Sequence, residues 1–236
     1  MRICVVETGR LNEGLFERWG DYPGMFECLW RRPEDQWDVW DCMAAPPPAD
    51  LHTYDAVILT GSAADAHADE PWILRLKETV AALHARRRKI LGICFGHQVV
   101  AGALGGASGR HHDGWELGMQ TLNLTDAFAT MPYGDDAARH VVFNIHRDQV
   151  TALPPGARLL GSTRHTPIHM YALDDHILCL QSHPEFSREL VADLVQSLSP
   201  TRDFGAARVA EALARLGEHP TNTASRALVE RFLRGA

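Results

Sequence analysis

The residue types in this chain that are best suited to chemistry are a cysteine between two glycines and a histidine followed closely by a glutamate. Cys94 lies within Gly-Ile-Cys-Phe-Gly, and His183 and Glu185 lie within Ser-His-Pro-Glu. A thiolate beside an imidazole, with a carboxylate to orient the ring, is the general arrangement for acyl transfer through a thioester. The two motifs therefore predict a triad in which Cys94 is the nucleophile and His183 is the base.

The residues around Cys94 predict a sharp turn that joins a strand to a helix. Ile90–Ile93 is an apolar run typical of a strand buried on both faces, and His97–Leu104 has apolar residues at a helical period. The flanking glycines remove the side-chain carbons that would collide at such a turn. The start of the helix favours a thiolate, and the N–H of Phe95 is placed to bind an oxyanion. The alternative is a buried structural cysteine at an ordinary strand–helix turn. The residues that accompany Cys94 decide between a nucleophile and a structural cysteine.

A second buried strand, predicted at Ile177–Gln181, ends just before His183. Functional groups in open α/β sheets gather at the carboxyl ends of the strands, so we expect Cys94 and His183 at one edge of the same sheet. Glu185 can face the same side as His183, and Pro184 stiffens the link between them.

Size and composition restrict the classes of protein that fit. The chain has 236 residues, 45% hydrophobic and 22% charged, as in an ordinary globular protein with a substantial core. Its formal net charge of −7 disfavours nucleic acid and anionic membranes as partners. The five cysteines include no C-x-x-C pair, which argues against a disulfide framework or a thiolate zinc site. The histidines show no metal-binding spacing, so we expect no metal and no other cofactor.

The sequence also predicts a location. Strand-like residues begin directly after Met1 and Arg2, so we expect no signal peptide. No uninterrupted apolar run approaches the ~20 residues that span a bilayer. Together with the odd number of cysteines, these features predict a reduced, cytoplasmic protein.

Strands and helices alternate along the first part of the chain. The strands are expected at Ile3–Val6, Asp38–Trp40, Tyr54–Leu59 and Ile90–Ile93, and the helices at Leu11–Trp30, Trp72–Arg88 and His97–Leu104. This alternation predicts an α/β fold with a flavodoxin-like open parallel sheet and helices on both faces.

After Gly106 the pattern changes to short strands separated by turn residues. Strands are expected at Leu117–Leu124, Val141–Ile145, Leu159–Ser162, Ile168–Leu173 and Ile177–Gln181, several of them paired antiparallel in a layer added to the sheet. Helices are expected at Arg188–Leu198, capped by Ser187, and at Phe204–Leu216 and Ala224–Leu233, the last two packed on the outside.

The motif G-I-C-F-G-H-Q, followed later by H-P-E, resembles those of the class I glutamine amidotransferase domain, which are G-x-C-x-G-x-Q and H-P-E. The resemblance extends over Ile3–Leu198. It implies one such domain at residues 1–200, with residues 201–236 as a helical extension packed on it. It also implies cysteine-dependent hydrolysis or transfer at a γ-glutamyl amide bond, through a γ-glutamyl thioester on Cys94.

The resemblance implies further site residues. Thr60-Gly61-Ser62 occupies the place of the family's oxyanion-hole loop, so Gly61 or Ser62 would join Phe95 as backbone donors. Many members have two glycines and a proline there, and this chain departs from that pattern. Gln98, one helical turn beyond Cys94, would contact the γ-glutamyl group. A solvated helix residue is the alternative for Gln98.

A narrower similarity points to stand-alone members typified by plant γ-glutamyl peptidases. It is carried by Gly61-Ser62, Asp65-Ala66, Pro71–Ile73, Gly109-Arg110, Gly114–Gly118 and His146–Val150. The substrate would then be a small γ-glutamyl peptide or conjugate, and Trp115 and His146 would line its pocket. The alternatives are a core or pocket-wall aromatic for Trp115 and an ordinary loop histidine for His146.

Three functions remain open from the sequence. The first is an independent hydrolase or transferase, and the second is a glutaminase subunit that delivers ammonia to a separate synthase partner. The chain has neither a P-loop nor a dinucleotide-binding glycine fingerprint, so a synthase would be another protein. The third is a non-catalytic binding protein on an enzyme fold, which the intact triad motifs disfavour.

Overall fold

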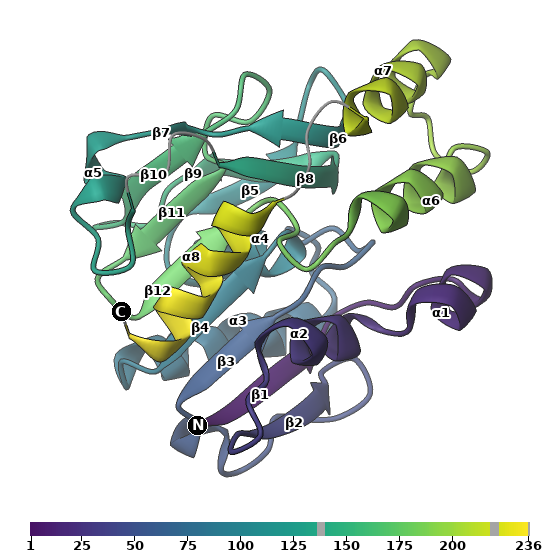
Figure 1. Cartoon of the computed structure of the whole chain (residues 1–236). Coiled ribbons are helices and arrows are strands. Elements are labelled where there is room, and N and C mark those ends of the chain that lie inside the picture. The colour runs from purple at the N-terminus through teal and green to yellow at the C-terminus, as the bar shows by residue number, and fades with distance from the viewer. Residues whose placement is uncertain (136–139, 218–221, 236) are drawn as a thin grey trace.

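The computed structural model describes residues 1–135, 140–217 and 222–235. Its centre is an eight-stranded sheet in the order β2-β1-β3-β4-β12-β11-β10-β7 (Figure 1). Five strands run parallel: β2 (Gln36–Asp41), β1 (Arg2–Glu7), β3 (Ala56–Leu59), β4 (Lys89–Ile93) and β12 (Ile177–Leu180). Three continue the sheet antiparallel: β11 (Met170–Leu173), β10 (Arg158–Ser162) and β7 (Asn123–Leu124).

Helices cover both faces of the parallel strands. Successive side chains of β1 point to opposite faces of the sheet. On one face, Ile3 and Val5 pack with α2 (Tyr22–Trp30) and α8 (Thr223–Arg234). On the other face, Cys4 and Val6 lie in the core with α3 (Pro71–Ala85) and α4 (Phe95–Ala103). Burial on both faces explains why these strands are apolar throughout. The predicted flavodoxin-like open sheet is confirmed.

The antiparallel strands form two arrangements instead of one layer. β11, β10 and β7 extend the main sheet, whereas β6 (Glu116–Thr121) pairs with β8 (Val141–His146) and β5 (Ala107–Arg110) pairs with β9 (Asp148–Ala152). The predicted single strand Leu117–Leu124 is wrong, because the chain changes partner at Leu122 and continues as β7. β5 and β9 were not predicted, since they are short and largely polar. A short helix, α5 (Asp126–Ala129), follows β7.

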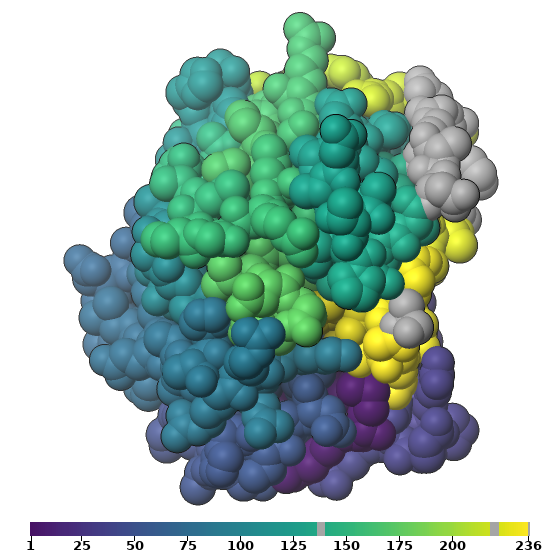
Figure 2. Space-filling view, turned by 90° about the vertical axis from the view of Figure 1, so that its left-hand side faces the viewer, coloured from purple at the N-terminus to yellow at the C-terminus, as the bar shows by residue number. Residues whose placement is uncertain are grey.

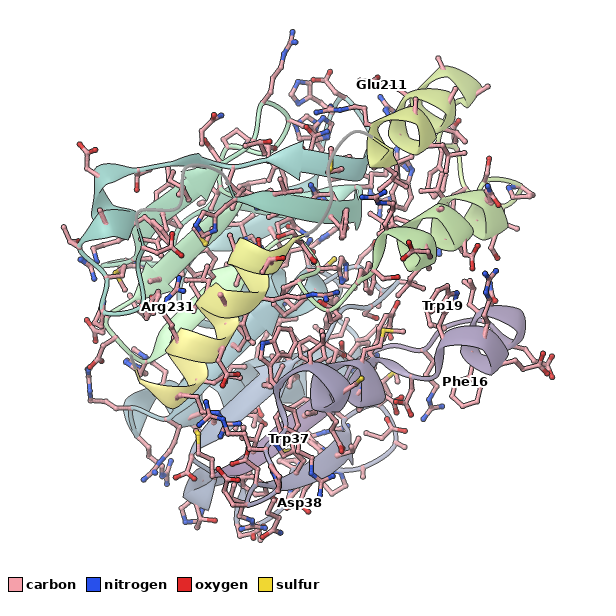
Figure 3. The ribbon with its side chains drawn as sticks, viewed as in Figure 1. Phe16, Trp19, Trp37, Asp38, Glu211 and Arg231 are labelled. Carbon is pink, nitrogen blue, oxygen red and sulfur yellow. The ribbon has the colours of Figure 1, made fainter. Side chains whose placement is uncertain are left out.

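The predicted helix at Leu11–Trp30 is two helices, α1 (Glu13–Trp19) and α2. The break has a local cause, because the Asp21 side chain accepts the N–H of Gly24 and starts α2 as a new helix. Trp19 points toward α6 (Arg188–Leu198), where its indole donates to Asp193 at 2.8 Å, while Phe16 points away from the body and is 52% exposed (Figure 3).

The C-terminal helices pack on different parts of the structure. Ser187 caps α6 as predicted, by accepting the N–H of Leu190, and α7 (Ala206–Leu216) packs on β6 and α6. α8 contributes Leu228 and Phe232 to the same core as β1, and Figure 2 shows the yellow C-terminal segment beside the purple N-terminal one. A 3-10 turn at Leu51–Thr53 precedes β3. Within the described ranges no helix has both the length and the apolar character that a membrane crossing requires.

Candidate active site

Cys94 lies at a strained turn between β4 and α4. Its backbone φ of 52° and ψ of −101° are unusual for a residue with a side chain, and its N–H donates to the Leu180 carbonyl of β12 at 2.8 Å. A Cβ on Gly96 would lie 2.6 Å from the Leu59 Cβ, so only glycine allows α4 to approach β3 this closely. The predicted elbow is therefore present, and it sets the cysteine at the carboxyl end of the sheet.

His183 and Glu185 lie in the loop that follows β12, the strand that pairs with β4. The Nδ1 atom of His183 is 2.7 Å from Oε1 of Glu185, and both side chains are buried. The imidazole stacks on Phe186 with 4.0 Å between ring centroids and 5° between ring planes. Since Nδ1 is occupied, the ring presents Nε2 as its other reactive nitrogen.

The thiol and the imidazole are close enough to interact. Burial by itself would lower the pKa of His183, but the Glu185 carboxylate and the Cys94 sulfur, which is in hydrogen-bonding reach, raise it to about 10. A Cβ on Gly61 would lie 2.8 Å from Cε1 of His183 and 3.7 Å from Cβ of Cys94, so Gly61 borders both residues. The three predicted triad residues therefore lie together in one buried cluster.

The loop predicted to form the oxyanion hole is fixed next to this cluster. The Thr8 hydroxyl donates to the Gly61 carbonyl at 3.0 Å, and the Gly96 N–H donates to the Thr60 carbonyl at 3.2 Å. The backbone N–H groups of Gly61, Ser62 and Phe95 make no hydrogen bond within the part of the chain that the structure describes. They are thus available as the predicted oxyanion donors.

A cavity opens onto Cys94 and His183. It is also lined by Ser62, Phe95, Gln98, Trp115 and His146, which are the remaining predicted site residues except Gly61 and Glu185. Glu185 is absent from the wall because it lies behind the imidazole. The cavity gives a small molecule access to the sulfur.

The sequence model of the family described as glutamine amidotransferase class-I matches residues 39–192. The chain belongs to this family. γ-Glutamyl peptidase 2 of Arabidopsis thaliana is 30% identical over 197 residues, which cover 82% of this chain and 79% of that protein. A glutamine amidotransferase-like protein of Schizosaccharomyces pombe is 31% identical over 237 residues, with 93% of each chain covered. The crystal structure of a glutamine amidotransferase from Thermotoga maritima has a TM-score of 0.79 at 19% identity, covering 100% of this chain and 99% of the other.

In this amidotransferase domain, Gln98 belongs to a polar chain behind the sulfur. Its Nε2 donates to the Asp148 carbonyl at 2.8 Å and to Oε1 of Gln181 at 3.1 Å, and Nε2 of Gln181 lies 3.6 Å from Sγ of Cys94. Both amide protons of Gln98 are thus used internally, and its Oε1 is the polar atom left for a ligand. The motif did not identify Gln181, although this residue lies between the end of β12 and Ser-His-Pro-Glu.

His146 is held by a second polar cluster in the cavity wall. Its Nδ1 lies 3.1 Å from the Asp148 carbonyl and its Nε2 lies 3.0 Å from Glu116, a carboxylate that also accepts from Thr163 and Thr166. Burial would raise the pKa of Glu116, but these hydrogen bonds and nearby histidines hold it well below the usual range. Glu116 was not predicted from the sequence, because only the β6–β8 pairing brings it opposite His146.

This cluster includes atoms that could also hold a metal. Glu116, His146 and His169 present ligand atoms within 4.8 Å of one another. Protein hydrogen bonds already engage both ring nitrogens of His146 and both carboxylate oxygens of Glu116. His146 and Glu116 therefore have the partners they need without an ion.

Hydrogen bonds from α8 and from its N-cap residue, Asn222, hold the His-Pro-Glu loop in place from outside. Asn222 donates to the Pro184 carbonyl at 2.9 Å and to the Phe186 carbonyl at 3.3 Å. Arg226 donates to the same two carbonyls, from Nε at 3.0 Å and from Nη2 at 2.9 Å. The sequence predicts this helix on the outside and predicts no role for it at the site, since no motif marks Asn222 or Arg226.

Proposed function

We propose that this protein hydrolyses γ-glutamyl amide bonds of small molecules through a thioester on Cys94. The observation that carries the proposal is the buried cluster of Cys94, His183 and Glu185 at the mouth of a cavity. A γ-glutamyl peptide or conjugate is the favoured substrate class, because relatives at about 30% identity are named γ-glutamyl peptidases.

The proposed reaction has two halves. The Cys94 sulfur attacks the amide carbonyl carbon, and the N–H groups of Phe95 and of Gly61 or Ser62 bind the resulting oxyanion. His183 gives its proton to the leaving nitrogen, and the amine departs as the thioester forms. His183 then takes a proton from water, the hydroxide attacks the thioester carbon, and the γ-carboxylate product leaves the regenerated sulfur. Glu185 keeps the imidazole oriented in both halves.

Three predicted side chains would hold the γ-glutamyl group. The free Oε1 of Gln98 suits the substrate's α-ammonium, and the Trp115 ring and His146 form the surrounding wall. Small γ-glutamyl molecules are thus the proposed partners, in the cytoplasm, where the five unpaired cysteines would stay reduced.

The purified protein tests this proposal without any addition. We expect hydrolysis of γ-glutamyl peptides by the wild type, and a loss on the order of 10⁴-fold for Cys94→Ala and Cys94→Ser with the fold intact. A well-folded Cys94→Ser variant with wild-type turnover would contradict the proposal.

Covalent labelling by a glutamine-directed diazo-ketone is a second test of the reactivity of Cys94. Burial raises the pKa of Cys4, Cys42 and Cys179 to about 12, which makes these thiols poor nucleophiles. We expect the label on Cys94, with the exposed Cys28 as the internal control. Equal labelling of Cys28 and Cys94 would count against a special reactivity of Cys94.

The alternative is a glutaminase subunit whose oxyanion hole is completed by a synthase. It predicts no detectable activity alone and glutaminase activity on addition of a synthase encoded nearby. That outcome would change the partner and leave the roles of Cys94, His183 and Glu185 as proposed.

A further inference from the structure

Two arginines at the cavity have side chains without a partner among the described residues. Arg147 and Arg202 line the same cavity as Cys94 and are exposed. Neither makes an ion pair or a side-chain hydrogen bond with any residue in the described ranges. A guanidinium has five fixed donors, so an unpaired one in a cavity wall is suited to a planar anion.

The third arginine of this cavity is engaged by both carboxylates of the wall. Arg110 binds both carboxylates of the wall, Asp65 at 2.6 Å and Asp148 at 3.0 Å. Arg147 and Arg202 bring the wall to three guanidinium groups against two carboxylates, an excess of one positive charge in a chain whose formal net charge is −7. Their local field favours an anionic group within the cavity.

Arg147 also lies between this cavity and a second one. Together with Trp115 it lines a neighbouring cavity, whose wall includes neither Cys94 nor His183. The other guanidinium in its wall, on Arg208, already donates to the Phe204 and Asp113 carbonyls, at 3.3 and 2.9 Å. Glutamine, which loses ammonia, would leave this outer space unused, whereas a peptide leaving group extends into it.

We propose that Arg147 and Arg202 bind a carboxylate on the leaving-group side of the substrate. The substrate class is then a γ-glutamyl peptide with a free C-terminal carboxylate, in preference to glutamine or a neutral γ-glutamyl amide. The inference rests on the proposed function, since the leaving group is defined by attack at Cys94.

Matched peptides test the inference. γ-Glutamylglycine and γ-glutamyl-alanyl-glycine are compared with their C-terminal amides, in the wild type, Arg147→Met, Arg202→Met and the double variant. We expect the wild type to favour at least one acid over its amide in kcat/KM, on the order of tenfold or more. The double variant should lose that preference and keep its rate on the amides. Arg164→Met, which removes an exposed arginine outside both cavities, is the control and should behave as the wild type.

Two outcomes would overturn the inference. Equal rates on acid and amide in the wild type would show that the carboxylate is not bound. An equal loss on acids and amides in the double variant would place the arginines on the γ-glutamyl carboxylate instead.

Calorimetry on Cys94→Ala separates this inference from the proposed function. Tighter binding of an acid than of its amide, abolished when both arginines are replaced, supports the carboxylate site even if no turnover is found. Equal binding of acid and amide to Cys94→Ala would refute it.

Discussion

His183 is placed between a carboxylate on one side and a sulfur on the other, and this position determines how the site should respond to pH. With its pKa raised to about 10, the ring is protonated at neutral pH. In the proposed reaction this imidazolium is the acid that the leaving amine needs. Activity is therefore expected to fall on the alkaline side as the ring loses its proton.

Glu185→Gln should move this alkaline limit to lower pH. The substitution removes the carboxylate that raises the pKa of His183, so the ring loses its proton earlier as the pH rises. We expect the alkaline limb of kcat/KM against pH to shift down by one unit or more, with a smaller loss at neutral pH than His183→Ala causes. A profile identical to that of the wild type would show that Glu185 does not act on the ring.

Gln181→Leu should make Cys94 less reactive. Nε2 of Gln181 points at the sulfur from 3.6 Å, and a donor in that position stabilises a thiolate. We expect alkylation of Cys94 near pH 7 to slow several-fold, with thermal unfolding recorded to show that the fold is kept. Gln149→Leu on β9, which does not contact the sulfur, is the control. An unchanged alkylation rate in Gln181→Leu would leave this residue a purely structural role.

Single residues could be predicted from the sequence where a short motif carries them. Cys94, His183 and Glu185 were each predicted in this way and lie together in the structure, and Gln98 was predicted too, although its Nε2 is engaged internally. Glu116 and Gln181 were not, because their importance depends on contacts between distant segments. A glutamate opposite a histidine on a paired strand leaves no local signal.

At the scale of elements, the parallel core was predictable and the added strands were not. Buried parallel strands are apolar throughout, so their composition identifies them. β5 and β9 form a two-stranded pair of largely polar residues, and only the pairing itself makes them strands. The break between α1 and α2 was missed because their apolar residues continue across it.

The contact between α8 and the His-Pro-Glu loop leads to a prediction about rate. Asn222→Ala and Arg226→Met remove donors that fix the carbonyls on either side of Glu185. We expect kcat to fall on the order of tenfold, with little change in KM, because the base is displaced while the cavity wall is kept.

Arg231→Met is the matched control for this experiment. Arg231 lies on the same helix but bonds the Tyr133 carbonyl and Asp135, away from the loop (Figure 3). It should lower stability without this selective loss of kcat. An equal loss of kcat in all three variants would mean that the helix acts only through general packing.

At the scale of the whole molecule, Asp35 joins both ends of the described chain. Its buried carboxylate accepts from the Met1 ammonium at 2.8 Å, from Arg234 of α8 at 2.8 Å and from the Arg32 N–H at 2.9 Å. Hydrogen bonds from Arg234 are the main reason that the pKa of Asp35 lies well below its usual range. The N-terminal strand and the C-terminal helix are thereby fixed to one another.

Asp35→Asn should lower the free energy of unfolding by about 3–5 kcal/mol at neutral pH, because it removes the main partner of the largely buried Arg234 charge and leaves only the more distant Glu230. The pKa of Asp35 is depressed on folding, so its contribution is present above the unfolded value, near 4, and is lost as the pH falls toward the folded value. The difference between wild type and variant should therefore shrink in acid. Denaturant unfolding at several pH values measures this.

Asp50→Asn is the control for this prediction. Asp50 pairs with Arg2 at the surface, where its side chain is 52% exposed, so its loss should destabilise the fold far less than the loss of Asp35. Equal costs for the two substitutions would refute the special role of Asp35.

The hydrogen bonds from Asn222 and Arg226 to the His-Pro-Glu loop also have a consequence for synthesis of the protein on the ribosome. Asn222 and Arg226 come later in the chain than every residue of the cavity wall and than Cys94, His183 and Glu185, so the ribosome adds them after the rest of the site. A nascent chain can complete its sheet and its elbow while the histidine loop still lacks these four hydrogen bonds. The growing polypeptide would thus carry its sulfur for some time without a fixed base beside it, and hydrolysis would begin only once α8 has docked.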